Sequence, residues 1–113
     1  MKIAIIGSRN FNDYNLVTKT LLPYKPQITL MVSGGAKGAD SLGEKWAIEN
    51  NIQTLIFPAD WDKHGKRAGF IRNEDIINNC DGVIAFWDGQ SKGTGHSISL
   101  AQKYNKPVKV VTI

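Results

Sequence analysis

The chain has 113 residues, of which 42% are hydrophobic and 21% are charged. This length fits one domain of the commonest size, so we expect a single domain over residues 1–113. The composition is that of a soluble globular chain, and it contains neither an apolar run long enough to span a bilayer nor a charged-then-apolar leader. We therefore expect a cytoplasmic protein without a membrane partner.

The charge balance is basic, with 14 Lys and Arg against 10 Asp and Glu and a formal net charge of +4. A surplus of this size suits many soluble proteins as well as a nucleic-acid binder. The single cysteine, Cys80, has no partner for an intramolecular disulfide and cannot build a multi-cysteine metal site. The two histidines, His64 and His96, are too few to suggest one either, so we expect no metal and no resident cofactor.

Short apolar runs alternate with amphipathic segments from the first residue onward. Residues 1–6 (MKIAII) are mostly apolar and β-branched, as in a buried parallel strand. The next segment has helical spacing of its apolar residues and begins with Asn12 or Asp13, either of which is a suitable N-cap. Pro23 and Pro26 should prevent that helix from continuing.

The same alternation continues to the end of the chain. Further strands are predicted at residues 28–32, 52–57, 82–86 and 108–113. Further helices are predicted at residues 39–50, 68–79 and 95–104, and residues 59–67 (ADWDKHGKR) should form a polar loop. Alternating strands and helices imply right-handed parallel crossovers, hence an α/β, three-layer Rossmann-like sandwich with an open, mainly parallel five-stranded sheet and helices on both faces.

Basic residues gather in the loops that follow the predicted strands. Such sheets bind ligands outside the carboxyl ends of their strands, so these loops should meet at the ligand edge. The basic residues in or just after them are Arg9, Lys37, Lys63, Lys66, Arg67, Arg72 and Lys92. Their clustering indicates an anionic ligand; the alternative is that long loops are simply polar and solvated.

The stretch VSGGAKGAD, residues 32–40, follows a strand and opens a helix. Gly34, Gly35 and Gly38 let the backbone approach a ligand closely, and the start of the helix offers unpaired N–H groups, which together suit a phosphate. A tight turn into the helix without a ligand is the alternative. The pattern is neither a Walker A loop nor the dinucleotide fingerprint.

A second glycine cluster, residues 88–97, also follows a strand. Thr94 is placed either to cap the next helix or to bind a phosphate oxygen, or both. Two tryptophans lie near the ligand edge, where an indole can stack on a base. Trp87 fits loop packing and stacking equally, whereas Trp61 favours contact with a ligand or partner.

Five segments in this order resemble the SLOG superfamily, in particular its YspA-like group: IIGSRNF, VSGGAKGAD, FPADWDKHGKRAGFIRNEDII, DGVIAFWDGQSKGTGHSISLA and NKPVKVVTI. The resemblance runs from Gly7 to about Val111. It implies a Rossmann-like domain that binds a nucleotide or a nucleotide-derived phosphorylated ligand, such as an ADP-ribose-like or cyclic nucleotide. Relatives include cytokinin-activating phosphoribohydrolases, the DNA-processing protein DprA and nucleotide-sensing domains of antiphage systems.

The resemblance also assigns residues to the ligand site. With Lys37 and Trp87 added from the loop pattern, the expected ligand- and phosphate-binding residues are Gly7, Ser8, Arg9, Ser33, Gly34, Gly35, Lys37, Gly38, Asp40, Arg72, Asn73, Trp87, Gly93 and Thr94. In the phosphoribohydrolases a catalytic glutamate follows the glycine-threonine pair after two residues. Ser97 stands there in this chain and cannot replace a carboxylate.

Three functions remain open at this stage. The first is a sensor or carrier that binds a nucleotide, with Arg9, Lys37 and Arg72 neutralising phosphate charge. The second is a nucleotide N-glycosidic hydrolase, for which Asp40 and Arg72 are weak catalytic candidates. The third is DprA-like binding of single-stranded nucleic acid, less favoured because the motifs cluster compactly. A homodimer is expected, since a domain this small often completes its pocket with a second copy.

Overall fold

A five-stranded parallel sheet organises the structure, a computed structural model that describes residues 1–113. The strand order is β3-β2-β1-β4-β5, and every neighbouring pair is parallel. The strands are β1 (Lys2–Gly7), β2 (Leu30–Ser33), β3 (Gln53–Ile56), β4 (Gly82–Trp87) and β5 (Val108–Thr112). Each predicted strand lies within two residues of these bounds.

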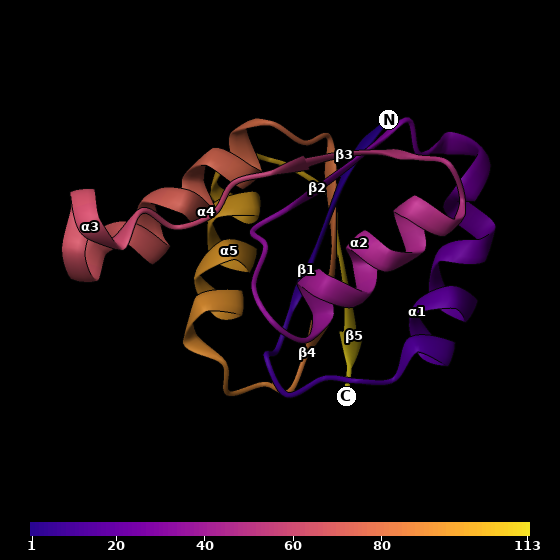
Figure 1. Ribbon diagram of the computed structural model, residues 1–113, viewed down its shortest axis with the longest axis horizontal. Helices are drawn as coiled ribbons and strands as arrows, with labels where there is room; N and C mark the ends of the chain where they lie inside the picture. The colour runs from indigo at the N-terminus through magenta and orange to yellow at the C-terminus, as the bar shows by residue number, and fades with distance from the viewer.

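Helices cover both faces of the sheet, as Figure 1 shows. The helices α1 (Tyr14–Leu21) and α2 (Ala39–Glu49) pack on one face, and α4 (Ala68–Asn78) and α5 (Lys92–Lys103) pack on the other. The prediction of a three-layer Rossmann-like sandwich is therefore confirmed. The longest helix has 12 residues, and none has the length and apolar character that crossing a bilayer requires.

Each face of the sheet has its own buried core, because alternate side chains of a strand point to opposite faces. Ile3 and Ile5 of β1 pack with Trp46 of α2 in one core, whereas Ala4 and Ile6 belong to the core beneath α4 and α5. On the α2 side the helix lies very close to the sheet. A Cβ added at Gly43 would stand 2.7 Å from the Cγ2 atom of Ile5.

The start of α5 differs from the prediction. The helix begins at Lys92 rather than near residue 95, so Ser91 is the N-cap and Thr94 lies in the first turn. Of the two roles left open for Thr94, capping is therefore wrong, and phosphate binding stays a prediction. The Asp88 carboxylate accepts hydrogen bonds from the backbone N–H groups of Gln90 and Ser91, both at 2.8 Å. This turn redirects the chain early enough for Gly93 to be helical.

The segment predicted to be a plain polar loop contains two short helices, α3 (Trp61–His64) and η2 (Gly65–Arg67). The Asp60 side chain caps α3 by accepting the backbone N–H of Lys63 at 3.1 Å. In Figure 1 this segment projects from the body of the molecule on the α4 side.

The structure around α1 shows which residue is the N-cap of this helix and how the chain continues after it. Asp13, not Asn12, is the N-cap of α1, because its carboxylate accepts the N–H of Leu16 at 3.1 Å. The two prolines do end the α-helix, but the chain continues as a 3₁₀ helix, η1 (Leu22–Gln27). A proline near the start of that 3₁₀ turn is acceptable because an N–H there has no helical partner.

Candidate functional site

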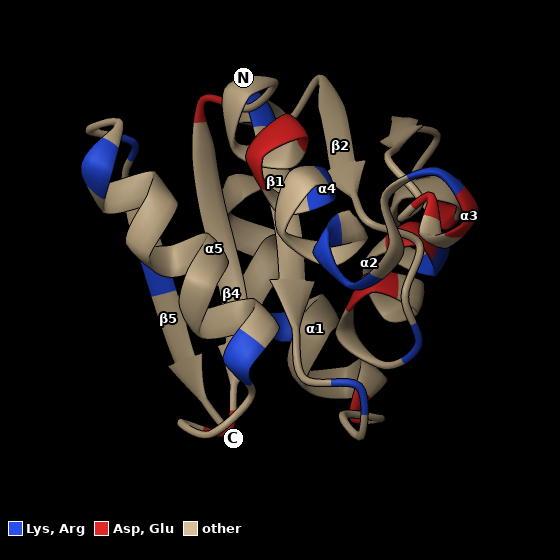
Figure 2. Ribbon diagram, turned by 90° about the vertical axis from the view of Figure 1, so that its left-hand side faces the viewer, with Lys and Arg blue, Asp and Glu red and all other residues tan.

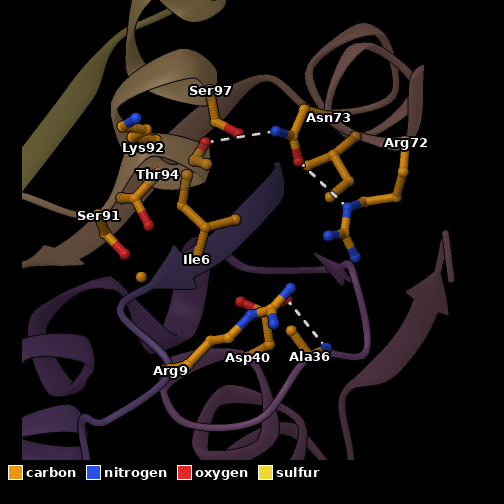
Figure 3. A pocket seen from close by; sticks show the side chains of 13 residues that line it. Ile6, Arg9, Ala36, Asp40, Arg72, Asn73, Ser91, Lys92, Thr94 and Ser97 are labelled. Atoms are coloured by element: carbon orange, nitrogen blue, oxygen red, sulfur yellow. Dashed lines mark hydrogen bonds between the residues drawn. The ribbon is translucent and has the colours of Figure 1, made fainter. Parts of the chain in front are cut away.

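A cavity of about 270 Å³ opens where the strand order reverses, at the carboxyl ends of β1 and β4. This is the position at which open α/β sheets bind their ligands. We call it the switch-point cavity; Figure 3 shows its lining. Arg9, Ala36 and Asp40 lie on one side, Ser91, Thr94 and Ser97 on the opposite side, and Arg72 and Asn73 between them.

One wall of the switch-point cavity is the first turn of α5. The backbone N–H groups of Lys92, Gly93 and Thr94 have no intrahelical partner, and the first bond of the turn joins the Gly95 N–H to the Ser91 carbonyl at 3.0 Å. The helix dipole adds a partial positive charge at this end. The buried hydroxyl of Thr94 lies beside these donors. This wall is chemically suited to an anion.

Two arginines contribute further positive charge. Arg72 is fixed in place, since its Nη1 donates to the Gly34 carbonyl at 2.7 Å and its Nε donates to the Asn73 Oδ1 at 3.1 Å. Asn73 in turn donates to the Gly93 carbonyl at 3.3 Å, which links α4 to the first turn of α5. Arg9 is exposed at the mouth of the cavity. Arg72 therefore has a defined position, while Arg9 is free to adjust to a ligand.

Asp40 supplies the one carboxylate in the lining, and it is only 5% exposed. Its Oδ2 accepts hydrogen bonds from the N–H groups of Gly34 at 3.1 Å and Ala36 at 3.3 Å. Burial raises the pKa of Asp40 to about 6, while those two N–H groups and the nearby Arg72 guanidinium act in the opposite direction. Burial also lowers the pKa of Arg72, and the Asp40 charge opposes that change.

The glycine stretch is consequently held from inside the protein. The Gly34 and Ala36 N–H groups bind Asp40, and the Gly35 N–H donates to the Ser33 Oγ at 3.2 Å. All three amides are thus already occupied, including those of Gly34 and Gly35, which sequence reasoning assigned to a phosphate. The free backbone donors of the switch-point cavity lie instead at the start of α5.

A second cavity, of about 370 Å³, adjoins the first and shares Arg9, Ala36 and Arg72 with it. We call it the Trp61 cavity. Its other lining residues are Gly34, Gly35, Lys37, Pro58, Ala59 and Trp61. The two cavities are therefore neighbours, and we call the pair the recess; it reaches from the first turn of α5 to the projecting α3 segment.

The structure brings most of the predicted site residues to this recess. Those that line the switch-point cavity are Gly7, Arg9, Asp40, Arg72, Asn73, Gly93 and Thr94, and Gly34, Gly35 and Lys37 line the Trp61 cavity. The other four, Ser8, Ser33, Gly38 and Trp87, line neither cavity.

These residues support the loops that line the cavities without lining a cavity themselves. The Ser8 Oγ accepts the N–H of Asp88 at 3.2 Å, and the Trp87 indole N–H donates to the Ser91 carbonyl at 3.0 Å, so both hold the chain that leads into α5. Gly38 has φ +80°, and a Cβ there would collide with the backbone oxygens of Ser8 and Arg9. This glycine is needed for close packing of two loops.

Sequence reasoning did not consider Ser91, and it assigned no ligand contact to Lys92, counted only among the basic residues of the ligand edge, or to Ser97, noted only for lacking a carboxylate. All three line the switch-point cavity. The early start of α5 explains the omission of Ser91 and Lys92. The signal that could have found Ser91 and Lys92 is Asp88, because its side chain forms a turn with Gln90 and Ser91 directly before the helix begins. Ile6 and Ile76, also in the lining, supply its apolar floor.

Basic residues from several elements surround the recess. Figure 2 shows Lys and Arg at the start of α5, within α4 and in the segment that surrounds α3. The α3 and η2 helices contribute Lys63, Lys66 and Arg67, all exposed. An anion that approaches the recess therefore meets a positive potential before it reaches either cavity.

Residues 1–64 match the YAcAr family, described as the YspA, cpYpsA-related SLOG family. The chain belongs to this family. The chain is also similar to the Gene 61 protein of Mycobacterium phage D29, with 36% identity over 116 residues that cover 95% of this chain and 93% of the phage protein. The resemblance stated from the sequence motifs is confirmed.

Two solved structures resemble the fold of this YAcAr-family chain. DNA processing protein A (DprA) from Helicobacter pylori, which has a single-stranded DNA binding mode, is 27% identical with a TM-score of 0.68 over 97% of this chain. DprA from Streptococcus pneumoniae is 23% identical with a TM-score of 0.78 over 96%. The chain spans 64% and 49% of those two proteins, so each has a large part with no counterpart here.

Proposed function

We propose that this protein binds a nucleotide or a nucleotide-derived phosphorylated ligand, with a phosphate group in the switch-point cavity. The carrying observation is the convergence in one cavity of free N–H groups at the start of α5 with the Arg9, Arg72 and Lys92 side chains. Backbone donors, a helix dipole and guanidinium groups are each favourable for phosphate oxygens. The volume of about 270 Å³ admits a small ligand group and is too small for a folded macromolecule.

Binding is proposed here in place of hydrolysis. Cleavage of a glycosidic bond canonically uses two carboxyl groups, one to protonate the leaving group and one to act as nucleophile or base. The cavity lining provides one, Asp40, and its Oδ2 already accepts two backbone hydrogen bonds. Ser97, at the position of the glutamate in the phosphoribohydrolases, also lines the cavity and brings only a hydroxyl.

The test is a thermal-shift screen of the purified protein against nucleoside mono-, di- and triphosphates, cyclic nucleotides and ADP-ribose. A ligand at about 100 times its dissociation constant adds roughly 2.7 kcal/mol to the free energy of unfolding, which raises the melting temperature clearly. Titration calorimetry then compares Arg9→Gln with Arg67→Gln, because both arginines are exposed but only Arg9 lines the cavities.

We expect Arg9→Gln to weaken the best nucleotide about tenfold, as loss of one charge-assisted hydrogen bond does, and Arg67→Gln to change its affinity less than twofold. Equal losses in the two variants would show diffuse attraction to a basic surface and would contradict the cavity assignment. Mass analysis of the bound nucleotide after incubation should return it intact; release of the free base would overturn the preference for binding over hydrolysis.

Binding of single-stranded nucleic acid is the second candidate. Its support is the likeness to the Helicobacter pylori DprA, which binds single-stranded DNA, together with the shared lining of the two neighbouring cavities. A strand with about four phosphate contacts gives a slope near −3 in a plot of log affinity against log salt concentration, since each contact contributes about −0.7. A short oligothymidylate with that slope and tighter binding than any mononucleotide would favour this candidate.

A further inference from the structure

Trp61 is held in a defined place although it is 53% exposed. It is the first residue of α3, and the Asp60 cap fixes the backbone of that helix. On the α4 side, a Cβ added at Gly69 would stand 3.5 Å from the Cη2 atom of the indole. The ring therefore rests near the first turn of α4, and much of its surface remains open to solvent.

The other walls of the Trp61 cavity suit a flat group attached to an anion. Pro58, Ala59 and Gly35 offer small or apolar surfaces, and Arg9, Lys37 and Arg72 supply positive charge. No Asp or Glu lines this cavity. Aromatic bases stack on tryptophan with little regard to sequence, because every base presents a π-face.

The shared lining connects this aromatic surface to the proposed phosphate position. Arg9 and Arg72 belong to both cavities, so a ligand that occupied the two cavities together would meet both arginine side chains. A nucleoside phosphate has this layout, with a planar base at one end, an anion at the other and a sugar between them.

We propose that the Trp61 cavity is a base subsite, in which the base of a nucleoside phosphate stacks on the Trp61 indole while its phosphate occupies the switch-point cavity. This inference rests on the proposed function and adds the part of the ligand that it leaves undefined. The unit recognised is a nucleoside phosphate, whether it arrives as a free nucleotide or as a residue of a single strand.

The subsite should discriminate poorly among bases. Gly34, Gly35 and Ala36 line this cavity, but their N–H groups are already hydrogen-bonded within the protein, so few fixed donors remain to read a base edge. Affinities for the adenine, guanine, cytosine and uracil monophosphates should accordingly fall within about tenfold of one another, since stacking is sequence-tolerant.

The experiment uses the intact protein and titration calorimetry. The probes form two pairs. AMP is compared with ribose 5-phosphate, which keeps the sugar and phosphate but lacks the base, and thymidine monophosphate is compared with a short oligothymidylate. The variants are Trp61→Ala and Trp61→Phe, with Tyr104→Ala as the control because Tyr104 is an exposed aromatic residue that lines neither cavity.

We expect wild type to bind AMP more tightly than ribose 5-phosphate. Trp61→Ala should weaken AMP about 5- to 100-fold, the range seen when a stacking aromatic is removed, and leave ribose 5-phosphate unchanged. Trp61→Phe should retain much of the preference for AMP, and Tyr104→Ala should behave as wild type. An equal loss of affinity for thymidine monophosphate and for the oligothymidylate in Trp61→Ala would show that a free nucleotide and a strand use one subsite. Whichever of these two probes binds wild type more tightly then identifies the form of the ligand, free nucleotide or strand.

Two results overturn the inference in distinguishable ways. Equal affinities of wild type for AMP and ribose 5-phosphate, or equal losses of both in Trp61→Ala, would remove the base subsite and leave the phosphate site standing. Failure of wild type to bind AMP, ribose 5-phosphate and the thymidine probes would also overturn the subsite, and if the thermal-shift screen finds no other nucleotide either, the proposed function fails with it.

Discussion

The Asp40 carboxylate lies between the glycine stretch and Arg72, almost fully removed from water. Burial raises its pKa to about 6 from the ordinary 3.8, even though the Ala36 N–H, the Arg72 guanidinium and the Gly34 N–H favour the charged form. The hydrogen bonds and the neighbouring cation therefore offset the cost of burying the charge only in part.

This balance predicts a pH dependence that Asp40→Asn removes. A raised pKa in the folded protein means that folding favours protonated Asp40, so the free energy of unfolding falls as the pH rises from about 4 to about 6 and is level above that range. We expect wild type to lose roughly 2 kcal/mol relative to the variant between those pH values. The measurement is urea unfolding of both proteins at several pH values.

The asparagine keeps an oxygen that can accept from Gly34 and Ala36, so the variant should fold. The difference in the free energy of unfolding between wild type and Asp40→Asn cancels the contribution of all other carboxyl groups that titrate over this pH range. Parallel stability curves for wild type and Asp40→Asn over this pH range would show that Asp40 titrates normally.

At the scale of one element, the first turn of α5 combines a role in folding with the proposed role in binding. Gly93 lies in that turn, lines the switch-point cavity and has nothing within 4 Å of the place where a Cβ would be. Its lack of a side chain is therefore not required by packing inside the protein. An occupant of the cavity would explain it.

Gly93→Ala should separate stability from binding. Alanine has a higher helix propensity than glycine, so we expect the free energy of unfolding to stay level or rise by up to about 1 kcal/mol. The new methyl group extends into open space at the cavity wall and should weaken nucleotide binding several-fold. Denaturant unfolding and calorimetry on the same preparation check both effects; unchanged affinity would place the phosphate away from this turn.

Element starts and short helices were the hardest features to predict. Strand positions were predicted well because buried parallel strands are continuous apolar runs bounded by glycine or proline. A helix of four residues in a polar segment has no apolar periodicity, so only Asp60 signalled α3. The glycines around Thr94 resembled a loop, and the predicted start of α5 was late for that reason.

At the scale of the whole molecule, two layers lie very close together where α2 crosses β1. Gly43 packs there against Ile5, which belongs to the core beneath α2. We expect Gly43→Ala to lower the free energy of unfolding by about 1 to 2 kcal/mol, because overpacking against a branched side chain outweighs the gain in helix propensity.

Gly93→Ala is the matched control for Gly43→Ala, because it is also a glycine-to-alanine change in a helix but its new methyl group has no atom within 4 Å. Opposite signs for the two variants in one denaturation series would support the close approach of α2 to the sheet. A Gly43→Ala protein as stable as wild type would mean that α2 shifts outward at little cost.

Parallel topology also explains why the candidate site was only half predictable. The carboxyl ends of all five strands lie at one edge, so alternation alone placed Arg9, Arg72 and Thr94 near one another. It could not reveal that the Asp40 side chain folds back to occupy the Gly34 and Ala36 amides. That contact depends on the three-dimensional path of the loop, and no spacing in the sequence specifies it.

The internal bonds of Asp40 and Arg72 to the glycine stretch have a kinetic and entropic consequence. Because Asp40 holds the Gly34 and Ala36 amides and Arg72 holds the Gly34 carbonyl, the conformational entropy of this loop is lost when the chain folds. A ligand then meets a preorganised wall and spends little of its interaction energy on ordering the backbone. Under the proposed function, association with the recess would therefore be a docking step without ordering of this loop.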